Sequence, residues 1–199
     1  MGKRGAPPTF ELHHLLRALY LICDHERLGR KRLAELLQIG EGTCRGVLGV
    51  LRGRGLITVG QRGIALSAEG REFIDSLPIA HGRVDLNKLA LARFTHAIAL
   101  RDHARFVRTG IEQRDDAVGA GAVGATALVC RRGRLHFPDG TALAEQFLED
   151  EMVLVATFRP MDGDLILLGY GRTEESAGMG AFAAAAGVLA IPILAAEVR

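Results

Sequence analysis

Seven basic side chains crowd into the segment between Leu28 and Arg62, which holds only two acidic residues, Glu35 and Glu41. The basic residues are Arg30, Lys31, Arg32, Arg45, Arg52, Arg54 and Arg62. Guanidinium and ammonium groups at this density attract phosphates, so the chemistry they indicate is the binding of a polyanion. The alternative is a solvated basic face without a partner, and the spacing of the residues along the chain has to decide between the two.

The charge of the chain changes sign near its middle. Over all 199 residues the net charge is only +2. Basic residues outnumber acidic ones by 12 to 8 in residues 1–77, whereas acidic residues outnumber basic ones by 15 to 13 in residues 78–199. With 48% hydrophobic and 24% charged residues, the composition is that of an ordinary globular protein of one or two domains. We therefore expect a basic first domain followed by a second domain of different character.

The residues present exclude several kinds of catalytic or metal site. Cys23, Cys44 and Cys130 are scattered, which matches neither a disulfide framework nor a zinc site and indicates a reducing, cytoplasmic location. None of the three serines lies in a Gly-x-Ser-x-Gly turn, and no phosphate-binding loop with Gly-Lys-Ser/Thr occurs. We expect no metal, no cofactor and no catalytic residue.

Neither end of the sequence predicts a membrane anchor. Residues 1–9 are basic and contain two prolines, with no apolar stretch behind them, so they predict a disordered basic arm rather than a signal peptide. The uncharged stretch 176–196 is long enough to cross a bilayer. It is rich in alanine and glycine and lacks an aromatic belt at either end, which favours a buried helix.

The spacing of apolar residues predicts three helices in the first 54 residues. Apolar residues recur every three or four positions over Phe10–Asp24, and the pattern repeats in shorter form over Arg30–Ile39. Thr43 is then expected to cap a third helix, with Cys44, Val47, Leu48 and Leu51 inward and Arg45, Gly46, Gly49 and Arg52 outward. Glycine inside a helix costs about 1 kcal/mol relative to alanine, so this helix should be weak or closely packed.

A β-hairpin and a fourth helix are expected to follow. Two short strands, Leu56–Val59 and Ile64–Leu66, enclose a Gly-Gln-Arg-Gly turn with Arg62 at its tip. Ser67 is expected to cap a helix over Ala68–Leu77, whose first turn carries Glu69. The order helix, helix, helix, hairpin, helix over residues 10–77 is that of a winged helix-turn-helix domain.

This order, carried by LAELLQIGEGTCRGVLGVLRGRGLI and LSAEGREFI, resembles the winged helix-turn-helix domains of prokaryotic transcription regulators. In such domains the third helix enters the major groove of double-stranded DNA, and the hairpin touches the backbone or the minor groove. The resemblance implies that Thr43 and Arg45 lie near base edges, and that Arg52, Arg54 and Arg62 meet phosphates. Arg30, Lys31 and Arg32 are further candidates for contacts with DNA.

The remainder of the chain mixes strands and helices. After a linker at 78–86, we expect strands at 88–100, 126–130, 135–137, 152–158 and 165–170, and helices at 105–118, at 141–148 and from Thr173 onward. This mixture over 87–199 predicts an α+β sandwich in which helices pack on one face of a mostly antiparallel sheet. The expected role of this domain is dimerisation, ligand sensing, or both.

The candidates for binding a ligand in the second domain are Arg114, Thr126, Gly169 and Gly171. Arg114 is in register with the apolar stripe of the helix at 105–118, and a buried guanidinium needs an acidic partner such as Asp102 or an anionic ligand. The two glycines lie between a strand and a helix, where glycine-rich turns bind phosphates. Glu174 and Glu175 oppose a phosphate there, so a helix cap is the simpler interpretation.

The second half of the sequence resembles the C-terminal domain of archaeal two-domain winged-helix proteins, a domain without an assigned function. The stretches that carry this resemblance are GIEQRDDAVGAGAVGATALV and DGDLILLGYG, with the Ala-rich helix after them. The predicted function is that of a DNA-binding transcriptional regulator that acts as a homodimer, away from membranes. Two alternatives stay open: an enzyme of nucleotide or vitamin metabolism fused to a winged helix, and a winged helix that binds a protein.

Overall fold

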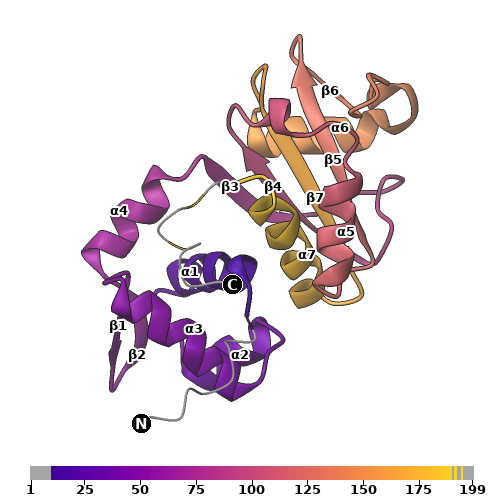
Figure 1. Ribbon diagram of the computed structural model, residues 1–199. Helices are drawn as coiled ribbons and strands as arrows, with labels where there is room; N and C mark the ends of the chain where they lie inside the picture. Colours follow the sequence, from indigo (N-terminus) through magenta and orange to yellow (C-terminus); the bar gives the residue numbers. More distant parts are fainter. Residues whose placement is uncertain (1–9, 190, 192–193, 195–199) are drawn as a thin grey trace. The chain divides into compact units, whose positions relative to one another are not determined.

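The computed structural model describes residues 10–189 together with Ile191 and Leu194 (Figure 1). The chain divides into two compact units, one that ends at Ser76 and one that begins at Leu77. Ile191 and Leu194, which the sequence assigned to the second domain, are buried and count with the N-terminal unit instead. The predicted basic arm at 1–9 lies outside the described residues.

The N-terminal unit has the predicted order of elements (Figure 1). Its elements are the helices α1 (Leu12–Asp24), α2 (Arg30–Leu36) and α3 (Glu41–Gly53), the strands β1 (Ile57–Gly60) and β2 (Gly63–Leu66), and the helix α4 (Ala68–Ser76). The core is apolar because each helix turns its three-and-four stripe inward, as Leu15, Leu19, Leu33 and Leu51 illustrate with no exposed surface. Three helices followed by a small two-stranded sheet form a winged helix.

The hairpin is attached to the helices at both of its sides. Leu28, just before α2, exchanges two backbone hydrogen bonds with Ile64 of β2, at 3.0 and 2.9 Å. Ser67, directly after β2, caps α4 as predicted: its hydroxyl accepts a hydrogen bond from the Gly70 N–H at 2.9 Å. The same hydroxyl donates to the Gly55 carbonyl, so one serine joins α4 to the turn before β1.

Helix α3 begins three residues earlier than the sequence predicted. Gly40, in an extended conformation, is the residue before the helix, and the helix starts at Glu41. Thr43 therefore lies inside the first turn and does not cap the helix, which corrects the prediction. The reason is that the glycines at 40 and 42 allow the chain to enter the helix without a side-chain cap, and Glu41 places a carboxylate near the positive end of the helix dipole.

The C-terminal unit is built on a five-stranded sheet in which every neighbouring pair of strands is antiparallel. The strands lie in the order β3, β4, β7, β5, β6. Their bounds are Ile79–Val84 for β3, Phe94–Leu100 for β4, Gly124–Arg131 for β5, Arg134–His136 for β6 and Leu165–Gly171 for β7. This confirms the predicted α+β class, and it corrects the linker at 78–86, because β3 pairs with β4 along its whole length.

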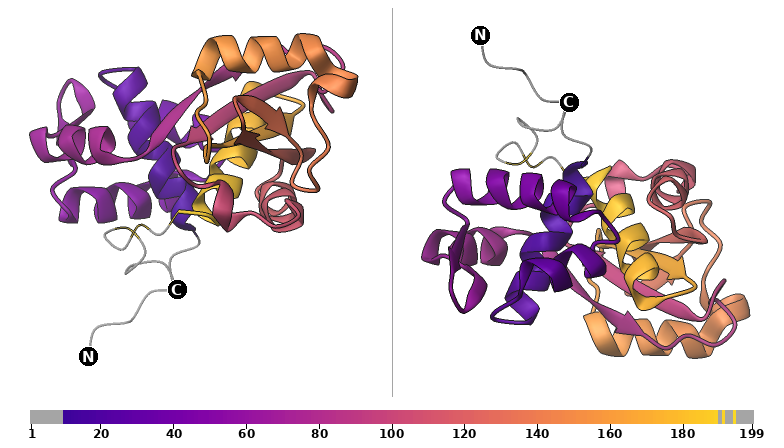
Figure 2. Two further views of the ribbon diagram at one scale, coloured as in Figure 1. Left: turned by 90° about the horizontal axis from the view of Figure 1, so that it is seen from above. Right: turned by 90° about the horizontal axis from the view of Figure 1, so that it is seen from below.

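Helices cover both faces of this sheet rather than the one face that was expected (Figure 2). Helix α6 (Ala144–Phe158) lies on one face, where Leu154 and Phe158 join a core with Ile166 and Leu168. Helices α5 (Ile111–Gly119) and α7 (Glu174–Ala186) lie on the other face. Thr173 caps α7 by accepting a hydrogen bond from the Ser176 N–H at 3.1 Å.

Three segments of the C-terminal unit differ from their predicted form. The strand expected at 88–100 is a strand only from Phe94, because residues 85–93 form turns. The helix expected at 105–118 is divided into a short 3-10 turn, Ala104–Phe106, and α5, with Gly110 in the left-handed conformation before α5. The helix and strand expected at 141–148 and 152–158 are one helix, α6, with a kink at Phe147.

Among the described helices, none is long and apolar enough to span a membrane.

Candidate nucleic-acid interface

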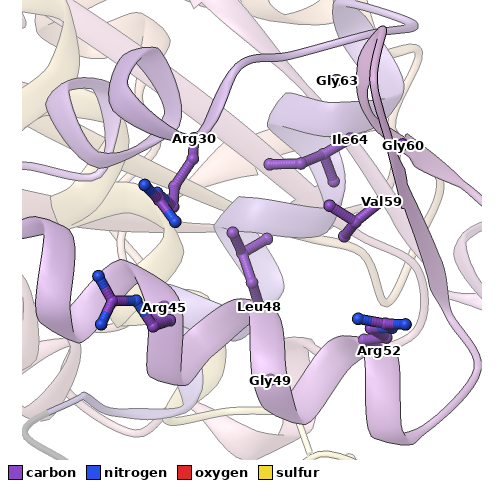
Figure 3. Close-up of a pocket in the computed structure, with 9 residues that line it drawn as sticks. All are labelled: Arg30, Arg45, Leu48, Gly49, Arg52, Val59, Gly60, Gly63 and Ile64. Carbon is purple, nitrogen blue, oxygen red and sulfur yellow. The ribbon is translucent and has the colours of Figure 1, made fainter.

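A groove of about 380 Å³ lies between α3 and the hairpin of the N-terminal unit (Figure 3). It is lined by Arg30, Arg45, Leu48, Gly49, Arg52, Val59, Gly60, Gly63 and Ile64. Leu48, Val59 and Ile64 form an apolar floor, and three arginines stand around it. Cationic rims over an apolar floor suit a partner that combines negative charge with flat or methyl-bearing groups, as the edges of DNA do.

Two features position these arginines: the backbone hydrogen bonds between Leu28 and the hairpin, and the helical spacing of residues in α3. The backbone pair between Leu28 and Ile64 sets the start of α2 beside β2, which brings Arg30 to the groove. Arg45 and Arg52 are seven residues apart, or two helical turns, so both project from the exposed face of α3 while Leu48 points toward the hairpin (Figure 3). The three arginines therefore come from α2 and α3, and the hairpin contacts both α3 and Leu28, just before α2.

The groove carries positive charge with little compensation. Arg30 lies 3.9 Å from Glu41, but both side chains are about half exposed, so the pair is weak. Arg45, Arg52 and Arg62 are exposed and take part in no ion pair with any residue that the structure describes. Three uncompensated guanidinium groups on one helix and its neighbouring hairpin attract phosphates and raise the rate of encounter with a polyanion.

Gly49 leaves the exposed face of α3 flat between Arg45 and Arg52. A Cβ atom added at Gly49 would meet nothing within 4 Å, so packing inside the protein does not explain the glycine. A glycine in the middle of an exposed helix costs about 1 kcal/mol relative to alanine. Because glycine has no side chain, the backbone of a partner can approach the helix closely at this position. This explains a glycine at an interface.

Of the eight residues predicted to bind DNA, the structure brings Arg30, Arg45 and Arg52 together around the groove. The other five lie elsewhere on the same unit. Lys31 and Arg32 are exposed on α2, where Arg32 donates a hydrogen bond to Glu35 at 3.2 Å. Thr43 is half-buried in the first turn of α3, Arg54 is half-buried at the end of α3, and Arg62 is exposed at the tip of the hairpin.

The apolar floor of the groove was not predicted from the sequence. Leu48 was expected to be core, and it is buried, yet its side chain also lines the groove. Val59 has half of its surface exposed, although it lies on the same face of β1 as the buried Ile57. The available signal was the period of two along the strand, which puts both residues on one face of a hairpin that extends beyond the core.

Arg114 does not occupy a buried ligand site. It is exposed on α5, where Gln113 and Ala117 are the buried residues, so the prediction of an inward guanidinium is wrong. The physical reason is that Gly110, at φ +80°, breaks the expected longer helix and resets the phase of the helical stripe. Ile111 and Val118, expected on the inward face, are exposed as well.

Gly169 and Gly171 serve packing instead of ligand binding. A Cβ atom at Gly169 would lie 2.3 Å from the backbone nitrogen of Ala181, and one at Gly171 would lie 2.3 Å from that of Ala177. Helix α7 therefore fills the space that a phosphate would need. Thr126 is engaged on the opposite face of the sheet, where its hydroxyl accepts a hydrogen bond from the Tyr170 hydroxyl at 3.0 Å. The four predicted ligand-binding residues do not form one site.

The three thiols show no sign of activation. Burial raises the pKa of Cys23, Cys44 and Cys130, and carboxylates near Cys130, those of Asp162 and Asp164 first, raise its pKa further. A thiol with a raised pKa is a poor nucleophile and a poor metal ligand. In the described part of the chain, no group of three or more His, Cys, Asp or Glu side chains could hold a metal ion.

The class of protein follows from comparison of both units with known families. Residues 11–72 match the family described as the PH0730-like N-terminal domain, and residues 91–189 match a domain of unknown function, DUF4443. The chain is therefore a two-domain protein with a PH0730-like N-terminal domain followed by a DUF4443 domain. A search of curated proteins found no match.

Among solved structures, the chain is similar to the hypothetical protein PH0730 from Pyrococcus horikoshii OT3. The two share 26% sequence identity with a TM-score of 0.76, and the alignment covers 95% of this chain and 100% of that chain. Similarity along the whole of an archaeal protein supports the predicted resemblance to archaeal two-domain proteins. It assigns no activity to either domain.

Proposed function

We propose that the protein is a transcription regulator whose N-terminal unit binds double-stranded DNA. The observation that carries the proposal is the exposed face of α3, where Arg45 and Arg52 stand beside the hairpin without an acidic partner among the described residues. A helix of this diameter fits the major groove, which is about 12 Å wide. The order of helices and hairpin in the unit is the one used for this purpose in winged-helix regulators.

The residues divide into two roles under this proposal. Arg45, together with Thr43 one turn or less away, faces base edges, where an arginine can donate two hydrogen bonds to guanine. Arg52, Arg54 and the hairpin-tip Arg62 contact phosphates, which set the position of the protein on DNA without reading sequence. Arg30, Lys31 and Arg32 at the start of α2 extend the phosphate contacts along the backbone.

Under this proposal the C-terminal unit dimerises the protein and has no catalytic activity. A single winged helix with a few phosphate contacts gives mostly non-specific binding, and two copies on neighbouring half-sites supply the specificity of a regulator. A small-molecule effector stays compatible with this role, but Arg114, Thr126, Gly169 and Gly171 are not its site.

The test is to select fragments bound by the purified protein from random duplex DNA. The proposal predicts an enriched motif with two-fold symmetry, because a homodimer presents the same helix to each half-site. Arg45→Ala should then relax the sequence preference, whereas Arg62→Ala should weaken binding to the motif and to random DNA alike. No enrichment and no retained duplex would contradict the proposal, and equal losses for both variants would contradict the two assigned roles.

The apolar floor of the groove favours a second candidate function, the binding of a protein partner. Val59 is exposed beside Leu48 and Ile64, and an acidic peptide with an apolar anchor would satisfy both the floor and the arginines. This candidate predicts no gel shift of duplex DNA at low salt, where DNA binding through phosphates is strongest. A shift at low salt that disappears as salt is raised favours DNA instead.

A further inference from the structure

Helix α6 of the C-terminal unit turns two carboxylates toward the sheet. Asp150 is buried and accepts hydrogen bonds from the backbone N–H groups of Asn87, Lys88 and Leu89, at 2.6, 3.0 and 2.8 Å. Glu151 is buried beside it and accepts from the Leu135 N–H at 2.8 Å. These contacts fix the rotation of the helix about its axis, because a turn in either direction would leave buried N–H groups without an acceptor.

Apolar side chains on another side of the same helix are open to solvent. Leu148 is 53% exposed, Met152 64% and Val155 37%, and they are spaced by four and three residues, so they form one stripe. Met161, three residues beyond the end of the helix, is 65% exposed. We call Leu148, Met152 and Val155 the outer stripe of α6.

A surface helix of a monomer buries its apolar stripe and exposes its charges. Helix α6 buries Leu154 and Phe158 in this way, but it also buries Asp150 and Glu151 and exposes the outer stripe. Contiguous exposed apolar side chains bordered by polar ones mark surfaces that another molecule covers. Since the buried carboxylates hold the helix in place, the stripe cannot reach the core of its own unit by rotation.

We propose that the outer stripe of α6 is the dimerisation surface and that its occupant is the same stripe of a second copy, packed antiparallel. Glu145 and Arg159 each lie seven residues from Met152, on opposite sides of it along the chain. In an antiparallel pair centred on Met152, the acidic end of each α6, which carries Glu145 ahead of the kink at Phe147, therefore lies beside the basic end of the other, which carries Arg159. A parallel pair would instead bring like charges together at both ends.

Both of these charged residues are available for such a contact. Glu145 and Arg159 are exposed, and neither takes part in an ion pair with another described residue. The negative charge lies in the first turn of α6 and the positive charge directly after its last turn. The stripe is thus self-complementary in charge as well as in apolar character, which is what a two-fold symmetric interface requires.

The size of the surface predicts a dimer of moderate affinity. The outer stripe lies on the part of α6 after the kink at Phe147, which is about 16 Å long, so each copy contributes less area than the roughly 800 Å² of a standard stable interface. Such a dimer dissociates in the micromolar range and is reinforced when both copies hold one DNA molecule. The inference extends the proposed homodimer by naming its surface, but its test needs no DNA, so either proposal can fail while the other stands.

Sedimentation velocity of the full chain over a range of concentrations tests the proposal. The wild-type protein should form a dimer, and Met152→Glu should raise its dissociation constant by about tenfold or more, because each dimer then buries two facing carboxylates at its centre. Ile111→Glu is the matched control, since Ile111 is 55% exposed on α5, which lies on the other face of the sheet from α6. This control should leave the dimer unchanged, and circular dichroism should show both variants folded.

A charge exchange tests the antiparallel register separately. Glu145→Arg and Arg159→Glu should each weaken the dimer by a few-fold, because each places like charges opposite one another. The double variant should restore the wild-type dissociation constant. A wild-type protein that stays monomeric at all concentrations would overturn the proposal. A dimer that Met152→Glu leaves intact would overturn it too, and a double variant weaker than either single one would overturn the register.

Discussion

Gly46 of α3 lies against the ring of Phe10: a Cβ atom at Gly46 would come within 2.8 Å of Cε1 of that ring, which is itself buried. Gly49, less than one turn further along the same helix, faces open space. The two glycines that weaken the helix therefore have different structural roles. Gly46 admits an aromatic ring that helps to hold the start of the chain to α3, and Gly49 keeps the exposed face flat.

This difference predicts opposite effects of alanine on stability. Gly49→Ala should raise the free energy of unfolding by about 1 kcal/mol, because it adds helix propensity and meets no other atom. Gly46→Ala should lower it by about 1 kcal/mol, because displacing the Phe10 ring costs more than the propensity gained. Urea unfolding followed by circular dichroism measures both, and stabilisation by Gly46→Ala would contradict the packing.

A methyl group at Gly169 should prevent α7 from packing on the sheet. Its Cβ would lie 2.3 Å from the Ala181 nitrogen and 2.4 Å from the Ala177 carbonyl oxygen, and backbone atoms of a packed helix cannot move aside cheaply. We expect Gly169→Ala to cost about 3 kcal/mol or more. Gly119→Ala is the control, because its Cβ meets nothing within 4 Å. Similar melting temperatures for the two variants would restore a ligand-binding interpretation of Gly169.

Removal of the Asp150 carboxylate should release the loop at 87–89. Asp150→Ala leaves three buried or half-buried N–H groups without their acceptor, which should cost about 3 kcal/mol. Asp150→Asn keeps one oxygen and should cost about half as much. Asp139→Ala removes a carboxylate that also accepts a backbone hydrogen bond but is exposed, so its cost should be under about 1 kcal/mol. Thermal unfolding of the three variants provides the comparison.

Acid should destabilise the N-terminal unit through His13. The pKa of His13 is lowered from 6.5 to about 3, first by burial and then by the nearby positive charges of His14 and Arg17. Between these two values the unfolded chain binds a proton that the folded chain does not, so stability falls as pH drops below about 6.5.

The limiting slope of this effect is about 1.4 kcal/mol per pH unit for one group. Replacement by an apolar residue, His13→Leu, removes the titrating group and should flatten the pH dependence between pH 6 and about 4 by that amount. Urea unfolding at several pH values measures the slope for both proteins. An equal slope in wild type and variant would show that His13 takes up its proton in the folded state.

The winged helix was predictable from sequence because its information is local. Leucines spaced by three and four residues define each helix face, glycines mark each turn, and Ser67 caps α4 where the pattern restarts. The cap of α3 was missed because a glycine entry to a helix leaves no side-chain signal. Arg45 and Arg52 followed from the same periodicity, since residues opposite an apolar stripe are exposed.

The C-terminal unit was less predictable because tertiary contacts override its local patterns. The run from Met152 to Phe158 is rich in β-branched residues and predicts a strand, yet it is helical, because Asp150 and Glu151 anchor α6 to backbone groups distant in sequence. The sequence of strand β3, which contains His81 and Gly82, is typical of a linker, and the segment is a strand because it pairs with β4. Gly110 shifted the phase of α5, which is what moved Arg114 from an expected inward position to the surface.

The central claim, that α3 and the hairpin hold DNA, is tested most directly by the salt dependence of binding to a labelled duplex between about 50 and 200 mM salt. Each phosphate contact contributes about 0.9 to the slope of log affinity against log salt, so Arg52→Ala with Arg62→Ala should reduce the slope by about two. Arg71→Ala, which removes an exposed arginine of α4 in the same unit, should leave the slope unchanged. Equal slopes for the double variant and the wild type, or no binding of duplex by the wild type at the lowest salt, would contradict the account.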